Sequence, residues 1–284
     1  VDAYEKLGVP IWAITQQNEP QNYITQNWAT CIFTPEAQLA FIRDHLGPAM
    51  KAANKSTKLL FNDDDKNFLP EVAKLIIEDD VAAEYVHGAG IHWYFFDQYD
   101  ALKDYKEKYL SRYQLLSTEN ALGSTDINFP TPWQLAVRMP HGVIVDFVTG
   151  GSRAFVDYSL TAGAGGNENI VLLDNGTFIA KDAYYTFGQV TRYVRKGSYL
   201  LSSVEVVNPG KPADGIHPAG VEAMATINPD RTEVVVLIIR DEEDKEHAST
   251  FDIDVELGDG QHVTVTLENV ENLSVSTLVV KGRF

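Results

Sequence analysis

Two glutamates in this chain stand where carboxylates could form a catalytic pair. Glu19 follows the apolar run at residues 9–14, and Glu119 follows a second strand candidate at residues 115–118. In glycoside hydrolysis one acid protonates the departing oxygen while a second carboxylate attacks the sugar carbon. A glutamate at a strand end is more often solvated or ion-paired. The elements around both residues therefore have to bring them together.

Other side chains that could take part in sugar chemistry lie at or near the ends of the predicted strands. Asn18 precedes Glu19 and could bind a sugar hydroxyl through a hydrogen bond that strengthens in the transition state. Trp93 and Tyr94, which follow His92, could stack on a sugar ring. The run Asp63–Asp65 could bind a cation, but a solvated loop or an aspartate bonded to neighbouring strand ends is the simpler interpretation.

The sequence gives little support for a metal or a cofactor. No two histidines have the His-x-x-x-His spacing that is typical of zinc, and Cys31 is the sole cysteine. The glycines at residues 163–166 lack the Lys-Ser/Thr of a phosphate loop and are expected to form a flexible loop. We therefore expect no metal and no cofactor.

The elements that must position these residues alternate between strands and helices up to about residue 195. Such alternation predicts βα units around a parallel sheet. Thr34 and Pro35 are expected to be the N-cap and first residue of one helix. The expected strands are residues 11–15, 58–61, 90–94, 115–118 and 154–158, and the other expected helices are residues 68–77, 101–113, 133–148 and 182–194.

After Gly197 the pattern changes to an alternation of period two. It is clearest at residues 251–257, where four apolar residues alternate with three acids. This alternation predicts antiparallel strands with one buried face. Further strands are expected at residues 234–239, 262–267 and 273–280. We therefore predict two domains, a barrel-type domain at residues 1–196 and an antiparallel β-sandwich at residues 197–284.

Composition restricts the partners of the protein. The chain has 284 residues, 44% of them hydrophobic, and a formal net charge of −17 with a pI near 4.7. A nucleic-acid-binding protein needs a basic face, so we expect no nucleic-acid partner. No apolar run reaches the roughly 18 residues that a transmembrane helix needs, so no transmembrane segment is expected.

Three Asn-x-Ser/Thr triplets are candidate glycosylation sites, at Asn54, Asn175 and Asn272. Such triplets are also common in ordinary polar loops. Among the tryptophans, Trp12 and Trp133 are expected to be core or helix-face side chains. Trp28 follows Glu19 on the same loop and could border the entrance to a site.

Several blocks of the sequence resemble the family 30 glycoside hydrolases, especially their glucosylceramidase branch. They are "VPIWAITQQNEP", "FTPEAQLAFIRDHLGP", "DDDKNFLPEVAKLIIEDDVAAEYVHGAGIHWY" and "LLSTEN", in this order and spacing. Further similarity extends through "YYTFGQVTRYVRKGS" to the terminal strands. The 100 residues between Glu19 and Glu119 also match the family, which places its glutamates on barrel strands four and seven.

The resemblance implies a fold, a reaction and roles for single residues. The fold would be an α/β (β/α)₈ TIM barrel with an attached β-sandwich. The reaction would be hydrolysis of a β-glucosyl linkage with retention, most simply in glucosylceramide, with Glu19 as general acid/base and Glu119 as nucleophile. Residues expected to support the sugar or the nucleophile are Asn18, His92, Trp93, Tyr94 and, on the eighth strand, Phe155.

This sequence departs from the family pattern at three points. Phe155-Val-Asp-Tyr158-Ser159 stands where the family usually has Trp-x-x-Trp-Asn, and Ala121 replaces a common cysteine. The pattern also begins at the fourth strand, so the first three βα units are expected to be missing from this sequence. A second chain or an N-terminal segment would then complete the barrel.

Other functions stay open on the sequence. An endo-β-1,6-glucanase or a β-xylosidase of the same family would carry the same two glutamates. From a different class, the chain could be an inactive carbohydrate-binding fragment. The resemblance also implies a secreted or lysosomal location and a β-glucoside or glucosylceramide as the substrate partner.

Overall fold

The structure is a computed structural model, in which the chain forms two compact units. The first unit is residues 1–120 with 149–157, and the second is residues 121–148 with 158–284. The structure describes residues 1–22, 30–94, 96–121, 132–162, 169–202, 204–207, 209–210, 214–215, 217–242, 249–256, 260 and 262–284.

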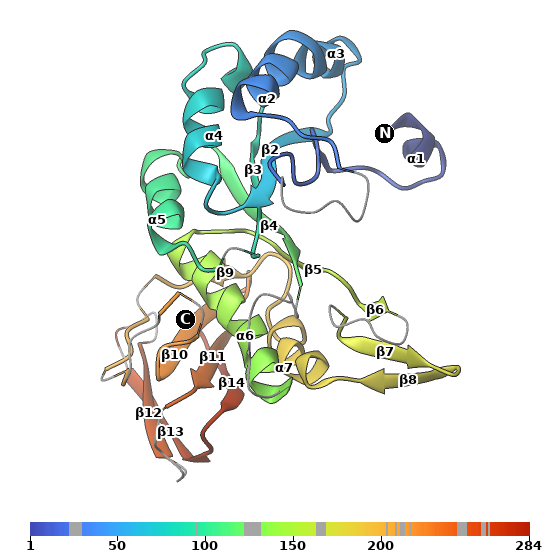
Figure 1. Ribbon diagram of the computed structural model, residues 1–284. Helices are drawn as coiled ribbons and strands as arrows, with labels where there is room; N and C mark the ends of the chain where they lie inside the picture. The colour runs from blue at the N-terminus through green and yellow to red at the C-terminus, as the bar shows by residue number, and fades with distance from the viewer. Residues whose placement is uncertain are drawn as a thin grey trace. The chain divides into compact units, whose positions relative to one another are not determined.

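The first unit is built on a five-stranded parallel sheet in the order β1-β2-β3-β4-β5 (Figure 1). Each strand pairs with the strand that precedes it along the chain, as in the wall of a (β/α)₈ barrel. The five predicted strands are thus confirmed in order. Their bounds are β1 Ala13–Thr15, β2 Lys58–Asp65, β3 Gly88–His92, β4 Gln114–Asn120 and β5 Phe155–Asp157.

Helices connect these strands, as the alternating pattern predicts. Thr34 is the N-cap of α2, with its hydroxyl accepting a 3.3 Å hydrogen bond from the Ala37 amide, and Pro35 is the first helical residue. Helix α4 buries one face at the i, i+3, i+4 and i+7 spacing of Leu69, Val72, Ala73 and Ile76. The helical elements are α1 Asp2–Lys6, α2 Pro35–Phe41, the π-helical turn Ile42–Leu46, α3 Gly47–Ala52, α4 Leu69–Ile77, the 3₁₀ turn Ala82–Glu84 and α5 Tyr99–Lys108.

In the described residues of the second unit there are two helices and three antiparallel or mixed sheets. Helix α6 spans Pro132–Ile144 and is followed by a π-helical turn at Val145–Thr149, while α7 spans Asp182–Thr191. The small sheet has the order β6-β7-β8, in which Asn175 and Gly176 form a tight hairpin turn with positive φ at both positions. Its strands are β6 Thr161–Ala162, β7 Val171–Asp174 and β8 Thr177–Ala180.

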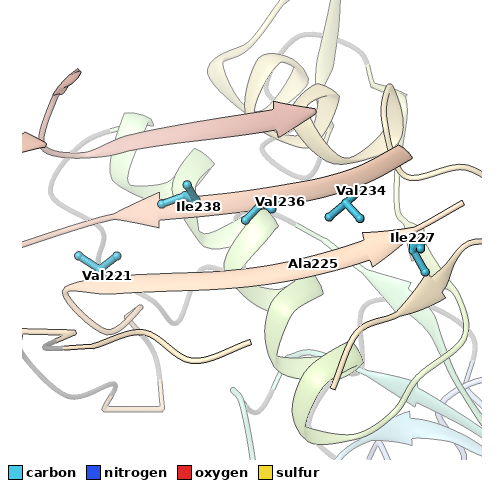
Figure 2. Close-up of a cluster of buried hydrophobic side chains, with 6 residues drawn as sticks. All are labelled: Val221, Ala225, Ile227, Val234, Val236 and Ile238. Atoms are coloured by element: carbon cyan, nitrogen blue, oxygen red, sulfur yellow. The ribbon is translucent and has the colours of Figure 1, made fainter. Parts of the chain in front are cut away.

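A four-stranded sheet of order β14-β11-β10-β9 forms the centre of the C-terminal part. An apolar cluster covers one region of it, and Figure 2 shows its members on β10 and β11. Phe251, Ile253 and Leu267 from the β12-β13 pair pack against this cluster. The strands are β9 Tyr199–Leu200, β10 Val221–Ile227, β11 Glu233–Arg240, β12 Ser249–Glu256, β13 His262–Val270 and β14 Ser274–Lys281.

The alternation predicted for residues 251–257 is confirmed on β12 in its described part. Val255 is buried and Phe251 and Ile253 are half-buried, whereas the three acids between them are exposed. The assignment of this region as a β-sandwich domain stays a prediction. So do the domain boundary after residue 196 and the further segment or second chain that would complete the barrel.

The two helices of the second unit pack against its large sheet. Thr277 of β14 donates a 2.9 Å hydrogen bond to the Gln189 carbonyl of α7. His141 of α6 lies 2.6 Å from the Glu222 carboxylate of β10, and the Trp133 indole donates to the Leu273 carbonyl. None of the described helices is both long enough and apolar enough to cross a membrane.

Candidate active site

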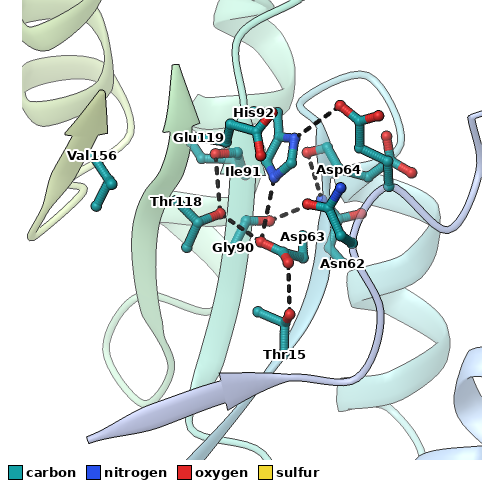
Figure 3. Close-up of polar contacts among 12 residues, drawn as sticks. Thr15, Asn62, Asp63, Asp64, Gly90, Ile91, His92, Thr118, Glu119 and Val156 are labelled. Carbon is teal, nitrogen blue, oxygen red and sulfur yellow. Dashed lines mark hydrogen bonds and ion pairs between the residues drawn. The ribbon is translucent and has the colours of Figure 1, made fainter. Parts of the chain in front are cut away.

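The candidate site lies at the carboxyl ends of β1 to β4, where side chains from separate strands converge. Glu19 follows β1, Asp63 lies near the end of β2, His92 ends β3, and Glu119 is the second-last residue of β4. Figure 3 shows His92, Asp63 and Glu119 close together across neighbouring strands. The sequence expectation that these strand ends meet is therefore confirmed.

Glu19, Glu119 and His92 lie close together in the site. One carboxylate oxygen of each glutamate and one ring nitrogen of His92 all lie within 4.8 Å of one another. The Tyr94 hydroxyl donates a 2.7 Å hydrogen bond to Glu119 Oε1, and the Asn22 amide donates a 2.7 Å bond to Glu19 Oε2. Each carboxylate thus accepts a hydrogen bond from a neutral donor.

Asp63 joins four strand ends into one network, which confirms the interpretation of an aspartate bonded to neighbouring strand ends. Thr15 of β1 donates to Asp63 Oδ2 at 2.6 Å, and Thr118 of β4 donates to Oδ1 at 2.7 Å. His92 Nε2 of β3 lies 3.3 Å from the same Oδ1. Its signal in the sequence is the run of three aspartates that continues an apolar strand.

The backbone at Asp63 is irregular in a way that points its side chain across the sheet. Asn62 and Asp63 have φ values of 66° and 53°, and the β2-β3 pairing shifts register between Asn62 and Asp64. Such a bulge re-aims a side chain next to a functional site. The Asp63 carbonyl also accepts a 2.9 Å bond from the Glu19 amide, so one residue fixes both His92 and the loop that carries Glu19.

Gly90 provides the space for this network. A Cβ atom at Gly90 would lie 2.8 Å from Thr118 Oγ1 and 2.9 Å from Asp63 Oδ1, distances that real Cβ contacts do not show. Only glycine therefore lets the hydroxyl and the carboxylate meet beside β3.

His92 is the electrostatic centre of the site. Its ring is 1% exposed, and its nitrogens lie 3.3 Å from Glu19 Oε1 and 3.3 Å from Asp63 Oδ1. Burial by itself would lower the pKa of His92, but hydrogen bonds with Asp63 and Glu19 and the charges of Asp63 and Glu119 raise it to about 10. Each ring nitrogen of His92 then carries a proton and can donate to a carboxylate.

The pKa values of the acids around His92 are shifted in two directions. Burial is the largest single influence and opposes ionisation of Glu19 and of Asp63. The hydrogen bonds that each accepts and the charge of His92 together outweigh it and lower the pKa of each carboxyl. Asp64 is different, because burial dominates there and raises its pKa to about 6 despite bonds from the amides of Gln21 and Asp65. The positive charge of His92 thus stabilises the ionised forms of both Glu19 and Asp63.

An open cavity of about 510 Å³ lies beside this network. Asn18, Asp63, His92, Thr118 and Glu119 provide its polar wall. Apolar side chains complete it, namely Pro10, Ile11, Trp12, Ala13, Ile14, Leu60 and Leu116. A concave site with an apolar body and a few convergent polar groups suits a small organic ligand such as a sugar.

The prediction that Trp12 is a core or helix-face side chain is wrong. Trp12 is 56% exposed, lines the cavity and contacts the ring of His87 edge-on, at 5.7 Å between centroids. It precedes a three-residue strand, and its side chain lies on the cavity side. Trp133 is half-buried on helix α6, as expected.

The other predicted site residues fall into three groups. Asn18 is exposed in the cavity wall, and Tyr94 reaches the site through Glu119. Trp93 is only 5% exposed and Phe155 is half-buried on β5, and neither lines this cavity. Trp28 lies outside the described residues. The substrate-binding roles of all five stay predictions.

The three candidate glycosylation sites differ in their surroundings. Asn54 and Asn175 are exposed in turns with positive φ. The Asn272 amide instead donates a 2.7 Å bond to the Glu242 carbonyl, while its oxygen accepts a 2.8 Å bond from the Glu242 amide. A glycan on Asn272 would compete with the first of these bonds.

Comparisons with known proteins agree with this geometry. The family model of the glycosyl hydrolase family 30 TIM-barrel domain matches residues 1–187. The lysosomal acid glucosylceramidase of Mus musculus is 28% identical over 265 residues, which is 86% of this chain and 48% of that protein. The endo-1,6-β-D-glucanase BGN16.3 of Trichoderma harzianum is 29% identical over 250 residues, 84% of this chain and 47% of that protein.

The fold likeness extends over nearly all of the chain. The crystal structure of SrfJ from Salmonella typhimurium superposes with a TM-score of 0.79 at 22% identity, covering 99% of this chain and 60% of that one. The chain spans about half the length of the curated relatives that it matches.

Proposed function

Because the chain belongs to glycosyl hydrolase family 30, we propose that the protein hydrolyses a β-glucosyl linkage with retention of configuration, with glucosylceramide as its substrate. The observation that carries this proposal is the approach of Glu19 and Glu119 oxygens to within 4.8 Å of each other. Retaining glycosidases need carboxyl groups about 5 to 5.5 Å apart, whereas inverting enzymes separate them by about 6.5 to 9.5 Å to admit a water.

We assign the nucleophile to Glu119 and the acid/base to Glu19. The hydrogen bond from Tyr94 orients one oxygen of Glu119 and leaves the other free to attack the sugar carbon. Glu19 contacts His92, which can exchange a proton with it, as a general acid/base requires. Asn18 lines the cavity beside Glu19, where its amide can bind a sugar hydroxyl.

The reaction then follows a double displacement. Glu119 attacks the anomeric carbon and forms a glycosyl ester while a proton passes from Glu19 to the departing oxygen. In the second step Glu19 takes a proton from water, which attacks the ester and releases Glu119. The buried network around His92 holds both carboxylates in place during these steps.

Glucosylceramide is favoured as the substrate by the likeness to the mouse lysosomal acid glucosylceramidase. A lysosomal or secreted location belongs to the same proposal. Asn54 and Asn175 are then the acceptors most open to a glycan, because both are exposed. Removal of N-glycans from the protein isolated from its own cells should shift its mass if this route is correct, and an unshifted mass would argue against it.

The experiment that tests the function uses the intact protein with aryl β-glucosides, aryl β-xylosides, glucosylceramide and β-1,6-glucan. We expect hydrolysis of glucosides and glucosylceramide, with the β-anomer as the first product in an NMR time course. Glu119→Gln should lower kcat by at least about 10⁴-fold while the melting temperature stays near that of the wild type. Ordinary turnover by this variant, or an α-anomer as first product, would contradict the proposal.

An endo-β-1,6-glucanase is the second candidate, and the likeness to the Trichoderma harzianum enzyme favours it. Release of gentio-oligosaccharides from β-1,6-glucan, with glucosylceramide left intact, would replace the first candidate by this one. Preference for xylosides would indicate a β-xylosidase. Binding of glucosides without turnover of any substrate would indicate a carbohydrate-binding fragment.

A further inference from the structure

We propose that Asp63 is a positioning residue that holds His92 as the proton store of Glu19, so that the proton used in glycosidic cleavage resides on His92 Nδ1 in the resting protein. This inference rests on the proposed function and adds the residue that supplies the acid's proton. It is carried by the contacts of Asp63 and His92 and not by the two glutamates alone.

The first argument is how firmly Asp63 is held. Thr15 binds one carboxylate oxygen at 2.6 Å and Thr118 the other at 2.7 Å, from strands on either side (Figure 3). The absence of a Cβ on Gly90 lets these groups meet. Asp63 is therefore fixed before any substrate binds, and its remaining hydrogen-bonding capacity on Oδ1 is directed at His92 Nε2.

The second argument is that His92 has acids on both ring nitrogens. Asp63 occupies Nε2 and Glu19 occupies Nδ1, both at 3.3 Å, and the ring is 1% exposed. A buried imidazole between two carboxylates is stabilised as the cation. Because Asp63 keeps the Nε2 proton, the proton that can move is the one on Nδ1, and its acceptor is Glu19 Oε1.

The proton transfer balances over the catalytic cycle. In the first step the Nδ1–H bond of His92 breaks and an O–H bond forms on Glu19, whose proton then goes to the departing oxygen. His92 is left neutral, with Nε2–H still donating to Asp63. In the second step the attacking water gives a proton to Glu19, which returns it to His92 Nδ1 and restores the cation.

The charges around His92 favour this order of events. Glu19 faces it from the loop after β1, Asp63 and Asp64 from β2, and Glu119 from β4. The Glu119 charge supports the cation and disappears when the glycosyl ester forms. Formation of the glycosyl ester thus lowers the proton affinity of His92 in the same step in which His92 gives up its proton.

The test compares Asp63→Asn with the wild type on two aryl β-glucosides. A phenyl glucoside needs a proton on its leaving oxygen, whereas a 2,4-dinitrophenyl glucoside does not. We expect Asp63→Asn to lower kcat/KM about 10²- to 10³-fold for the phenyl glucoside and less than about tenfold for the dinitrophenyl glucoside. The basic limb of its pH profile should also move to lower pH. Equal losses on both substrates would overturn the proposal.

A second readout does not depend on activity. In ¹⁵N-histidine-labelled protein, with the His92 signals assigned by His92→Gln, both ring nitrogens of His92 should stay protonated above pH 8. In Asp63→Asn the ring should titrate at a lower pH. An unchanged His92 titration in a folded Asp63→Asn variant would overturn the proposal even if the enzyme is active.

Control variants separate this role from a general loss of folding. Asp79→Asn removes a carboxylate that caps the 3₁₀ turn Ala82–Glu84 and should leave both readouts unchanged. If Asp63→Asn does not fold, Thr15→Val can replace it, because it removes one hydrogen-bond donor to Asp63. This variant should lower kcat/KM about tenfold for the phenyl glucoside and by less for the dinitrophenyl glucoside. A wild-type protein without glycosidase activity would contradict the proposed function. The His92 titration would still show whether Asp63 holds the proton on His92.

Discussion

Two buried regions of this protein are built from opposite kinds of side chain. At the carboxyl ends of β1 to β4, Asp63 and His92 are 6% and 1% exposed, and each bonds charged or polar partners. On β10 and β11, Val234 and Val236 are 2% and 6% exposed within an apolar cluster. Burial is equal in the two regions, so burial alone does not identify the functional one.

The difference lies in what burial costs. Transfer of an apolar side chain out of water is favourable by about 1.5 to 3 kcal/mol, which stabilises the β10-β11 cluster directly. A buried charge costs free energy unless partners surround it, and its pairing rarely gives a net gain. Two acids and a histidine held together under the surface therefore indicate chemistry, and the next four variants test that distinction.

The largest effect on stability is expected from His92→Gln, which leaves Glu19 and Asp63 without their cation. Breaking a buried charge pair costs about 3–5 kcal/mol. The folded pKa of about 10 exceeds the unfolded value of about 6.5, so the stabilisation is complete below pH 6.5 and is lost as pH rises through 10. Urea unfolding should thus show the full loss at pH 6 and a smaller loss at pH 10.

The matched control for His92 is His262→Gln, since His262 pairs with Asp254 at 2.7 Å with both side chains more than half exposed. Solvent screens that pair, so this variant should unfold almost like the wild type at both pH values. Equal losses from the two histidine variants would remove the contrast between buried and exposed pairs.

A smaller or similar loss is expected from Ile238→Ala in the apolar cluster. Ile238 is 4% exposed on β11, and truncation of a buried isoleucine costs about 2–5 kcal/mol. The kcat of the molecules that stay folded should not change, because the cluster only stabilises. Ile179→Ala, at a position 45% exposed on β8, is the control and should cost much less. A selective fall in kcat would show that the cluster does more than stabilise.

Gly90→Ala should damage activity more than stability. The added Cβ would push Thr118 or Asp63 from its place, and such displacement in a site costs about 100-fold in kcat. Gly188→Ala is the matched control, because nothing lies within 4 Å of its Cβ position on helix α7. It should stabilise the protein by about 0.5–1 kcal/mol. Full activity of Gly90→Ala would show that the network tolerates a shift.

The smallest effect is expected from Asp157→Asn at the end of β5. Neither carboxylate oxygen of Asp157 has a hydrogen-bond partner in the described part of the chain, and burial raises its pKa to about 7. The native state then binds more protons than the unfolded state between about pH 4 and 7, so wild-type stability falls as pH rises through that window.

The asparagine variant removes this pH dependence. Relative to the wild type it should gain about 1–3 kcal/mol at pH 8 and close to nothing at pH 4, measured by chemical unfolding. Asp174→Asn, at an exposed position on β7, is the control and should show no such trend. A loss of stability at pH 8 would mean that the Asp157 charge has a partner.

Much of the fold followed from local patterns. The five parallel strands, the Thr34-Pro35 helix start and the acid-apolar alternation on β12 all depend on propensity and periodicity, which neighbouring residues define. Strand β10 and the β6-β7-β8 sheet were not predicted, because their apolar runs are short or follow glycine-rich sequence. Trp12 was misplaced, since an apolar residue beside a strand gives no sign of which face it takes.

The sequence by itself determined the two glutamates, their order along the chain and the strands that carry them, because strand order fixes which strand ends meet. Only the tertiary structure showed that Asp63 is the aspartate that joins these strand ends, and that its contact with His92 helps to raise the pKa of the histidine. The contacts that do so join residues 15, 63, 92 and 118 on four strands, and depend on a bulge and on the missing Cβ of Gly90. No local sequence pattern encodes the distances between strands. The charge of Glu19 and the position of its proton on His92 therefore depend on the tertiary structure.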